Sequence, residues 1–558
     1  MVNVKNLFGM AVMATALVGC SSNDNLAPDG KDNVGKTGEA YASFTINLPT
    51  TSGTRATEGE PSFDEGAAKE YEVKNGTILI FDKDGLYVTS AQLGTMNPWT
   101  PVKTDGVTTA AITTVQLSGV EVGGDYQALV LLNNDVDATT SKVKLPASGE
   151  LYSTWSANAK NATAAYTNTD YIFMANAPKY TGTTTEPTTL VPIANVCASR
   201  EEAQAKAATT VYVERGLAKV TMQNYTDGGY TVAEGTYKGD KVEIKNWQLD
   251  VTNKSTFPVH QTGSTGFAAI WSTPRFYDGD NKTFKRVYWG VDPNYSNANG
   301  NLQNLEACKN AFTMIGKNDI KGKTGNNHPQ YCLENTFDLA NMMQGQTTRV
   351  VFKAVYTPNT FTSGETFYKI GNNTAIWKKA DLEEQIHTVA VTAMGITDLA
   401  EQAKYVVKLD ANQNNISGEA GQHLIKAENI TYTGEAALSK VKPDIVDKIN
   451  EKLGLSADAG IATYLDGVTY YIARIKHFNE LTPWKAGKPY GTENDKYLGR
   501  YGVLRNNWYD LSVTSISGLG YPDVPEVKPT VPDDENEQYI NVEVKILSWA
   551  KRSQQIKL

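Results

Sequence analysis

The carboxyl end of this 558-residue chain carries a detached segment with the pattern of a β-strand buried on one side. Apolar and polar residues alternate with a period of two, and the apolar positions are Ile540, Val542, Val544 and Ile546, with Trp549 close behind. An acidic, proline-containing tether over 529–538 precedes the strand, and its composition predicts that it cannot pack a core. Such a strand must be paired, either within its own domain or in a neighbour's sheet.

A second segment near the amino end has the same one-sided pattern. Its apolar positions are Ala42, Phe44, Ile46 and Leu48. A loop of small residues over 51–57 follows and contains Arg55. A trypsin-like protease requires an extended, exposed bond after arginine, and the Arg55–Ala56 bond fits that requirement. The alternative is an ordinary loop arginine.

The first twenty residues indicate export. Lys5 precedes an apolar stretch over 7–18, which is too short to cross a bilayer as a helix. The sequence L-V-G-C at 17–20 resembles the bacterial lipobox, in which the leader is removed and the thiol of Cys20 is acylated. An ordinary secretory leader with an incidental cysteine is the alternative. The polar residues 21–36 are typical of a flexible tether.

Composition favours β structure in two or more domains. The chain has 29 tyrosines, 9 tryptophans and 46 glycines, and its net charge of −9 without a basic block argues against nucleic acid as a partner. Strand patterns separated by turn residues occur at 75–81, 86–93, 126–133, 171–174, 464–471 and 508–516. They predict β-sandwiches with little helix.

A domain boundary is expected near Ala208, after a short helical or linker segment over 199–208. The second block is long and is expected to carry insertions. One of them is a helix over 444–453, with Gly454 as its stop.

No motif of catalysis or metal binding is found in the sequence. The five histidines are far apart, and there is no HExxH, no GxSxG and no phosphate-binding loop, so neither an enzyme nor a cofactor is expected. Beyond Cys20 there are three cysteines without CxxC spacing, so no metal site is expected. A disulfide between Cys308 and Cys332 is one interpretation, and three reduced, buried thiols, including Cys197, are the other.

Several motifs in order resemble the fimbrillins, or type V pilins, of the Bacteroidales, and among them the major subunits of the shorter fimbriae. They include the lipobox at Cys20 and the strand before Arg55. Further motifs are F-M-A-N-A-P at 173–178, V-Y-V-E-R-G-L-A-K-V at 211–220, Y-C-L-E-N-T at 331–336 and the segment 498–520. Lys551 and Arg552 depart from the apolar carboxyl end that the family would suggest.

The resemblance implies a mainly all-β chain with two transthyretin-like β-sandwich domains and a few helical insertions in the second. It implies this division: signal peptide 1–19, tether and removable strand 20–55, first domain 56–208, second domain 209–528, and tether with donor strand 529–558.

The same resemblance implies a structural subunit of a pilus that supports adhesion and biofilm formation. The precursor would be a palmitoylated lipoprotein of the outer membrane, cleaved after Arg55 by an arginine-specific protease. The strand from Ile540 to Ile546 would then replace the strand from Ala42 to Leu48 in another copy or a related subunit, forming an extracellular fimbria.

Two other functions remain open at this point. The first is a tip or accessory adhesin of the same pilus, whereas an anchor subunit would need no cleavage loop. The second is a surface glycan-binding lipoprotein, which would need an exposed platform of aromatic rings.

Overall fold

The structure is a computed structural model of the whole chain. It describes residues 39–49, 66–93, 107–134, 143–158, 160–161, 171–180, 188–262, 285–286, 290–296, 302–409, 424–435, 441–456, 459–477, 497–533, 540–547 and 552–553. The lipidation site Cys20, the cleavage site at Arg55 and Ala56, and Trp549 lie outside the described residues.

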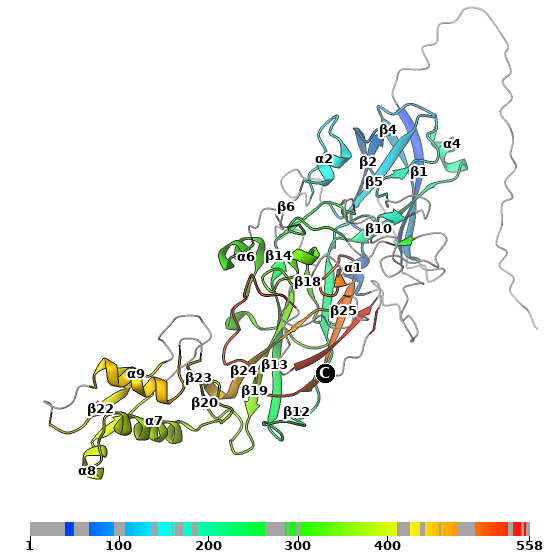
Figure 1. Cartoon of the computed structure of the whole chain (residues 1–558). Helices are drawn as coiled ribbons and strands as arrows, with labels where there is room; N and C mark the ends of the chain where they lie inside the picture. The colour runs from blue at the N-terminus through cyan, green and yellow to red at the C-terminus, as the bar shows by residue number, and fades with distance from the viewer. Residues whose placement is uncertain are drawn as a thin grey trace, which may run out of the picture. The chain divides into compact units, whose positions relative to one another are not determined.

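The first part of the chain forms an eight-stranded sheet in the order β3-β2-β5-β7-β10-β1-β4, with β9 paired to β5 (Figure 1). Its strands are β1 (Glu39–Pro49), β2 (Gly76–Asp82), β3 (Tyr87–Gln92), β4 (Val107–Ser118), β5 (Tyr126–Leu132), β7 (Met174–Asn176), β9 (Val191–Pro192) and β10 (Thr209–Arg215). Phe44 of β1, Ile78 of β2 and Val130 of β5 share one hydrophobic cluster, so the sheet folds over on itself into two layers. The hydroxyl of Thr113 in β4 donates to the carbonyl of Leu93, just after β3, where the two ends of the sheet meet.

The second part is a sandwich of two sheets. One has the order β18-β11-β25-β26-β27 and the other β12-β13-β19-β24. The strands are β11 (Ala218–Met222), β12 (Tyr230–Thr231), β13 (Lys241–Asp250), β18 (Gln330–Cys332), β19 (Arg349–Thr357), β24 (Val468–Arg474), β25 (Trp508–Ile516), β26 (Ile540–Leu547) and β27 (Arg552–Ser553). Trp247, Phe352, Tyr471 and Tyr509 lie fully buried in the core between the sheets. The expected architecture, mainly β with two sandwiches, is confirmed.

The change from one sheet to the next comes later than the expected position at Ala208. Strand β10 pairs with β1 and β7 of the first sheet, whereas β11 pairs with β18 and β25 of the second. The crossing therefore lies at Gly216 and Leu217. The pairing of β10 with β1 joins residues more than 160 positions apart, so local composition could not place this crossing. The division into domains remains a prediction.

A helical insertion with its own core lies between β19 and β24 (yellow in Figure 1). It contains β20 (Phe367–Ile370), α7 (Lys379–Ala393), α8 (Leu399–Gln402), β21 (Tyr405–Val407), β22 (Ile430–Tyr432), α9 (Pro443–Lys452) and β23 (Ile461–Tyr464). The predicted helix over 444–453 is confirmed as α9, and Gly454 follows it with φ of 69°. Helix α7 was not predicted.

Short elements complete the description. The helices are α1 (Ala68–Tyr71), α2 (Tyr152–Ser156), α4 (Arg200–Ala205) and α6 (Leu305–Ala311). The short strands are β6 (Lys160–Asn161), β8 (Lys179–Tyr180), β14 (Thr252–Asn253), β15 (Ser255–Thr256), β16 (Lys285–Arg286) and β17 (Phe312–Thr313). Single 3₁₀ turns lie at Lys317–Asp319, Leu339–Asn341, Ala427–Asn429 and Leu465–Gly467.

The interpretation of Cys308 and Cys332 as a disulfide is wrong for this structure. Both thiols are free and buried, as is Cys197. Cys308 belongs to α6 and packs in a small cluster with Val251 and Phe312, whereas Cys332 belongs to β18 and packs in the main core of the second sandwich. Burial raises the pKa of Cys308 to about 11 and that of Cys332 to about 12, so both stay protonated.

Candidate functional site

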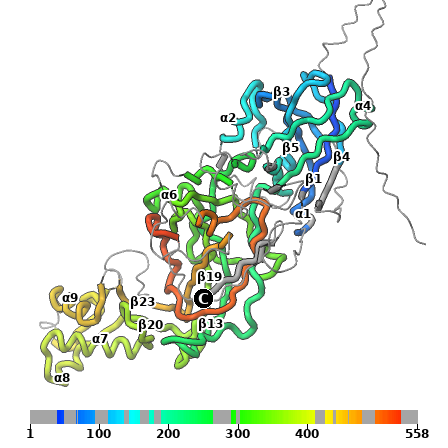
Figure 2. The backbone as a smooth tube through the Cα atoms, turned by 45° about the vertical axis from the view of Figure 1, so that its right-hand side comes forward, coloured from blue at the N-terminus to red at the C-terminus, as the bar shows by residue number. Residues whose placement is uncertain are grey.

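Strand β1 is an internal strand of the first sheet, although it lies near the amino end of the chain. It pairs antiparallel with β4 along its whole length, from Glu39 opposite Ser118 to Pro49 opposite Val107. On its other side it runs parallel to β10, with Phe44 to Asn47 opposite Thr209 to Tyr212. Both edges of β1 are therefore occupied. Figure 2 shows β4 running beside β1.

A further backbone bridge pairs β1 with the segment before α4. The amide of Tyr41 donates to the carbonyl of Cys197 at 2.9 Å, and the amide of Cys197 donates back at 2.8 Å. The two residues lie directly opposite each other in an antiparallel bridge. This contact extends the pairing of β1 on the β10 side toward its amino-terminal end.

The inward face of β1 forms part of the core. Ala42, Phe44 and Ile46 are fully buried, and Leu48 is 1% exposed. They pack in the cluster that also contains β2, β4, β5 and β10 residues. The predicted strand and its apolar inward face are confirmed, and Ala40 extends that face by one more buried position, but Ser43 and Asn47 on the opposite face are buried as well.

The outward face of β1 is covered by α4, which the sequence pattern did not reveal (Figure 1). The hydroxyl of Ser43, 6% exposed, donates to the carbonyl of Ala203 at 2.8 Å and lies 2.8 Å from the hydroxyl of Thr114. Arg200 lies over the ring of Tyr41 at 5.7 Å and donates to the carbonyl of Thr114 at 2.8 Å. Strand β1 is thus enclosed by backbone on two sides, by core below and by helix above.

The helix α4 has a sequence signal at its start. The hydroxyl of Ser199 accepts a hydrogen bond from the amide of Glu202, as an N-cap residue does. The segment 199–208 was expected to be helical or a linker, and residues 200–205 are helical. Its place over β1 could not be predicted, because it depends on contacts with β1 and β4, about 85 to 160 positions away.

Strand β26 contains the apolar residues of the carboxyl-terminal segment, and it pairs with β25 of its own chain. The pairing is antiparallel and runs from Trp508 opposite Leu547 to Ile516 opposite Ile540. Val544 is in register with Leu511 and Ile546 with Tyr509. The sequence left open whether this strand pairs within its own domain or in a neighbour's sheet. In the structure it pairs within its own chain.

The prediction that residues 529–538 cannot pack is wrong for Pro532 and Asp533, which are both buried. Asp533 is fully buried and accepts a hydrogen bond from the hydroxyl of Thr347 at 2.8 Å. Its amide donates to the carbonyl of Met342, and the amide of Gln344 donates to the carbonyl of Val531. Main-chain pairing with the segment 342–344 therefore compensates for the polar composition of this stretch.

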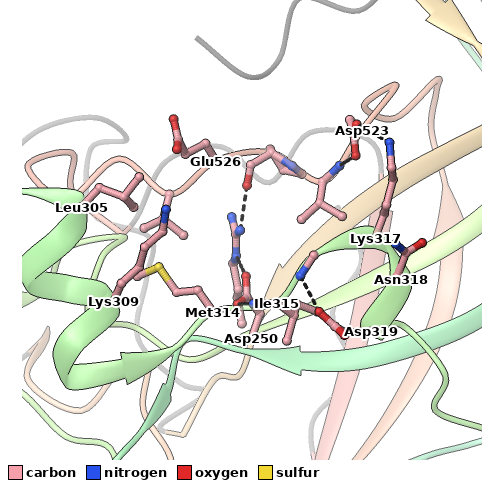
Figure 3. A pocket seen from close by; sticks show the side chains of 15 residues that line it. Asp250, Leu305, Lys309, Met314, Ile315, Lys317, Asn318, Asp319, Asp523 and Glu526 are labelled. Carbon is pink, nitrogen blue, oxygen red and sulfur yellow. Dashed lines mark hydrogen bonds and ion pairs between the residues drawn. The ribbon is translucent and has the colours of Figure 1, made fainter. Parts of the chain in front are cut away.

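The segment 523–527, just before this stretch, lines a pocket of about 550 Å³ (Figure 3). Arg349 stands in it and is 3% exposed; its Nε lies 2.8 Å from the carboxylate of Asp250, and its Nη2 donates to the carbonyl of Pro525 at 2.7 Å. At the rim, Lys317 pairs with Asp523 at 3.1 Å. These charged groups hold the segment 523–527 in place.

A buried polar cluster joins α1 to the second sandwich. Lys219 of β11 lies 2.9 Å from the carboxylate of Glu70, and its ammonium lies 3.5 Å from the ring centre of Trp508. Tyr331 also donates to Glu70, and Nε of Arg215 donates to the carbonyl of Glu70 at 2.7 Å. The first helix described after Arg55 is thus fixed to strands β11 and β18.

A second buried cluster joins β10 to the second sandwich. Nδ1 of His260 lies 2.9 Å from the carboxylate of Glu214, and Nε2 lies 4.0 Å from Glu334, which in turn faces Arg505 at 3.3 Å. Burial alone lowers the pKa of His260, but the carboxylates of Glu334 and Glu214 outweigh it and raise the pKa above its usual value. The cluster stabilises the connection between the sheets.

Neither a metal site nor a membrane span is found in the described ranges. No three histidine, cysteine or acidic side chains there are grouped so that they could hold a metal ion. Among the same residues, no helix combines the length and the apolar character needed to cross a bilayer.

Comparison with known proteins gives a family match for the carboxyl-terminal part of the chain, which contains β24, β25 and β26. Residues 462–555 match the family model described as major fimbrial subunit protein type IV, fimbrillin, C-terminal. The carboxyl-terminal region is similar to the corresponding region of fimbrillins. No curated protein sequence matches the chain.

Solved structures of fimbrial proteins are similar to this fimbrillin-like chain at low identity. A fimbrilin from Porphyromonas gingivalis is 11% identical, with 92% of this chain and 99% of that chain covered and a TM-score of 0.36. A tip fimbrial protein from the same species is 9% identical, with 92% and 100% covered and a TM-score of 0.30. A fimbrial assembly protein from Parabacteroides distasonis is 14% identical, with 61% and 93% covered and a TM-score of 0.27.

Proposed function

We propose that this fimbrillin-like chain is a structural subunit of an outer-membrane pilus that polymerises by strand exchange. The chain would be exported as a lipoprotein acylated at Cys20, and cleavage after Arg55 would release β1. The observation that carries the proposal is the position of β1, a core strand that is paired on both edges and is followed within ten residues by the Arg55–Ala56 bond. A strand in this position leaves a groove when it is removed.

The energetics favour refilling such a groove. Loss of β1 would unpair β4 and β10 and uncover the apolar residues beneath it. Burying four large apolar side chains is worth on the order of 6–12 kcal/mol before entropy costs. An incoming strand also restores the hydrogen bonds at both edges. An empty groove is therefore a strong acceptor for a strand with one apolar face.

Strand β26 is the candidate donor. It lies between β25 and the two-residue strand β27, so leaving its own sheet breaks one long ladder and one short one. Only residues 534–539 separate it from the packed end at Asp533. Before cleavage β1 fills the first sheet, so the donor would have no vacant groove to enter. Cleavage is then the trigger for assembly.

The first experiment compares Arg55→Ala with Thr54→Ala as the matched control. We expect Arg55→Ala to stay monomeric and lipid-bound, whereas Thr54→Ala forms fibres whose subunits begin at Ala56. Amino-terminal sequencing and electron microscopy provide the readouts. Normal fibres from Arg55→Ala would reject cleavage at this bond as the trigger.

A second experiment separates the donor strand from the fold of the monomer. A chain that ends at Glu535 lacks β26 and should remain folded by circular dichroism but form no fibres. In the full chain, Val544→Asp would bury an unpaired carboxylate in the acceptor groove, while Glu543→Gln should retain fibre yield. If removal of β26 unfolds the monomer, the strand serves its own sandwich and the exchange proposal fails.

Acylation is tested separately. A palmitate analogue supplied to cells should label the wild-type chain and leave Cys20→Ala unlabelled. Cys197→Ala is the matched control, because Cys197 is buried and free in the fold. Equal labelling of wild type and Cys20→Ala would show that the leader ends in an ordinary secretory site.

The insertion around α7 and α9 favours a second candidate, a tip or accessory adhesin of the same pilus. This insertion has its own hydrophobic core, so it can vary without disturbing the sandwich. Antibodies against it should label the whole fibre if the chain is the stalk subunit, and only the tip otherwise. The glycan-binding alternative has less support, since no aromatic side chain is exposed among the described residues.

A further inference from the structure

We infer that the incoming carboxyl strand binds the β1 groove in one register, in which Tyr539 takes the place of Tyr41, Asn541 that of Ser43 and Val544 that of Ile46. The inference rests on the proposed strand exchange and specifies its geometry. It is drawn from the outer face of β1 rather than from its apolar face, which any strand with period two would satisfy. The occupant is a second copy of this chain.

The helix α4 makes position 43 the most selective place in the groove. Ser43 is 6% exposed, and its hydroxyl contacts both the carbonyl of Ala203 and the hydroxyl of Thr114. A charged side chain here would lose its hydration beneath the helix, at a free-energy cost that a neutral side chain able to hydrogen-bond avoids. The outward residues of the carboxyl strand are Asn541, Glu543 and Lys545, and only Asn541 is neutral and able to donate a hydrogen bond.

The position of Tyr41 supports the same register independently. Its ring lies beneath Arg200, and its backbone pairs with Cys197. With Asn541 at position 43, Tyr539 falls at position 41, so Arg200 again lies over an aromatic ring. The match extends one step outward, where Glu537 falls at the position of Glu39.

Shifted registers lose these contacts. A shift by one residue turns the apolar side chains away from the core. A shift by two places either Tyr539 or Glu543 at position 43, beneath α4. In the inferred register Lys545 falls at Asn47, which is 8% exposed and lies two residues before the end of β1, so the long stem of the lysine carries the ammonium past the strand end to solvent.

The bridge between Tyr41 and Cys197 provides a direct test. In the inferred register residue 539 of one subunit lies opposite Cys197 of the next, at a Cα separation of about 5.5 Å, which suits a disulfide. We therefore expect mature fibres of Tyr539→Cys, oxidised with diamide, to remain as a ladder after boiling in SDS without reductant. The ladder should collapse to monomer with reductant, and it should be lost in the double variant with Cys197→Ala.

Cysteine variants at positions next to 539 distinguish the inferred register from shifted registers. Ile540→Cys should give no cross-link to Cys197, because residue 540 lies on the other face of the strand. Asn541→Cys should give none either, because residue 541 lies two positions further along the same face. If Glu537→Cys or Asn541→Cys links to Cys197 instead, the register is wrong while strand exchange stands. If fibres of all three variants at 537, 539 and 541 give no link, both the register and this groove are wrong.

A second pair of cysteine substitutions tests the register even if Tyr539→Cys does not form fibres. Asn541→Cys combined with Thr114→Cys should cross-link between subunits, because Thr114 is opposite Ser43 in β4. Asn541→Cys with Gln116→Cys is the matched control and should not, since Gln116 is opposite Tyr41. A link in the control pair and none in the test pair overturns the register.

Discussion

The ammonium of Lys219 in β11 lies 2.9 Å from the carboxylate of Glu70 in α1, and both side chains are almost completely buried. These two residues lie 149 positions apart. Because Glu70 comes only fifteen residues after Arg55, the pair holds the chain near the expected mature amino terminus against the second sandwich. Cleavage at Arg55 would release β1 while α1 remains attached.

Replacing Lys219 by methionine should destabilise the monomer strongly. The change leaves the Glu70 carboxylate buried without its counter-charge, and breaking a buried pair in this way typically costs about 3–5 kcal/mol. Urea unfolding followed by circular dichroism measures the change. Lys83→Met is the control, since Lys83 pairs with Asp84 in full exposure to solvent and its removal should leave the midpoint unchanged. Equal midpoints for the two variants would contradict the stabilising role of the buried pair.

Phe44→Ala should affect the precursor and not the assembled subunit. Phe44 is fully buried in the first core, and truncating such a side chain costs about 3–5 kcal/mol. The uncleaved Arg55→Ala precursor carrying Phe44→Ala should therefore melt earlier than the Arg55→Ala precursor alone. Fibres from cleaved Phe44→Ala should melt as wild type does, because β1 is no longer present. A lower melting temperature of those fibres would indicate that β1 stays in the subunit.

Local alternation predicted the bounds of several strands, whereas of the strand expected over 171–174 only Met174 belongs to a strand, β7. Strand β25 was expected at 508–516 and has those bounds, and β2 was expected at 75–81 and covers 76–82. Helix α7 was missed, although Leu382, Ile386 and Ala390 recur every four residues and are buried. Its mixed polar and β-branched sequence hid that stripe, since Thr388, Val389 and Thr392 weaken a helical pattern.

The pairing between segments that are distant in the sequence could not be predicted from local sequence patterns. The alternation of β1 and β26 indicated two strands with one apolar face, but not that α4 covers β1 or that β26 pairs with β25. Composition also suggested a free tether, whereas Asp533 is buried because Thr347 supplies a hydroxyl at the right place. Such contacts depend on side chains almost two hundred positions apart, and a single sequence does not reveal them.

The free energy of unfolding of the monomer should decrease as the pH rises from 5.5 to 8. Burial raises the pKa of Asp292 to about 7, against hydrogen bonds from the amides of Thr336 and Asn294, and His260 also has a raised pKa. Both groups bind protons more tightly in the folded chain than in the unfolded chain, so folding is favoured at lower pH. The Asp292 contribution is lost between about pH 4 and 7, and that of His260 as the pH rises through its folded pKa.

Melting curves of Asp292→Asn at several pH values check this assignment. The melting temperature of the variant should fall less between pH 5.5 and 8 than that of wild type, because one of the two groups no longer titrates. Asp319→Asn is the control and should keep the wild-type slope, since Asp319 is the exposed last residue of a 3₁₀ turn. A wild-type slope in Asp292→Asn would show that Asp292 does not titrate in this range.

The length of chain after Asp533 should limit assembly. Thr347 and Met342 hold Asp533 in place, so only the six residues 534–539 connect it to β26. Fully extended, six residues span roughly 20 Å. Deleting Glu535 and Asn536 shortens this reach by about a third, and we expect a loss of most of the fibre yield while the melting temperature of the monomer stays the same.

The complementary change lengthens the tether. Four added glycine and serine residues after Glu535 should preserve fibre yield, because loop closure costs little more for a slightly longer flexible chain. The same four residues inserted between 457 and 458, in the helical insertion, control for added length elsewhere. Releasing the fixed point with Thr347→Val should partly rescue the shortened tether, since the segment before Asp533 can then detach and extend. Fibre yield by electron microscopy decides the matter: a shortened chain that polymerises as wild type does would mean that Asp533 does not fix the start of the donor segment.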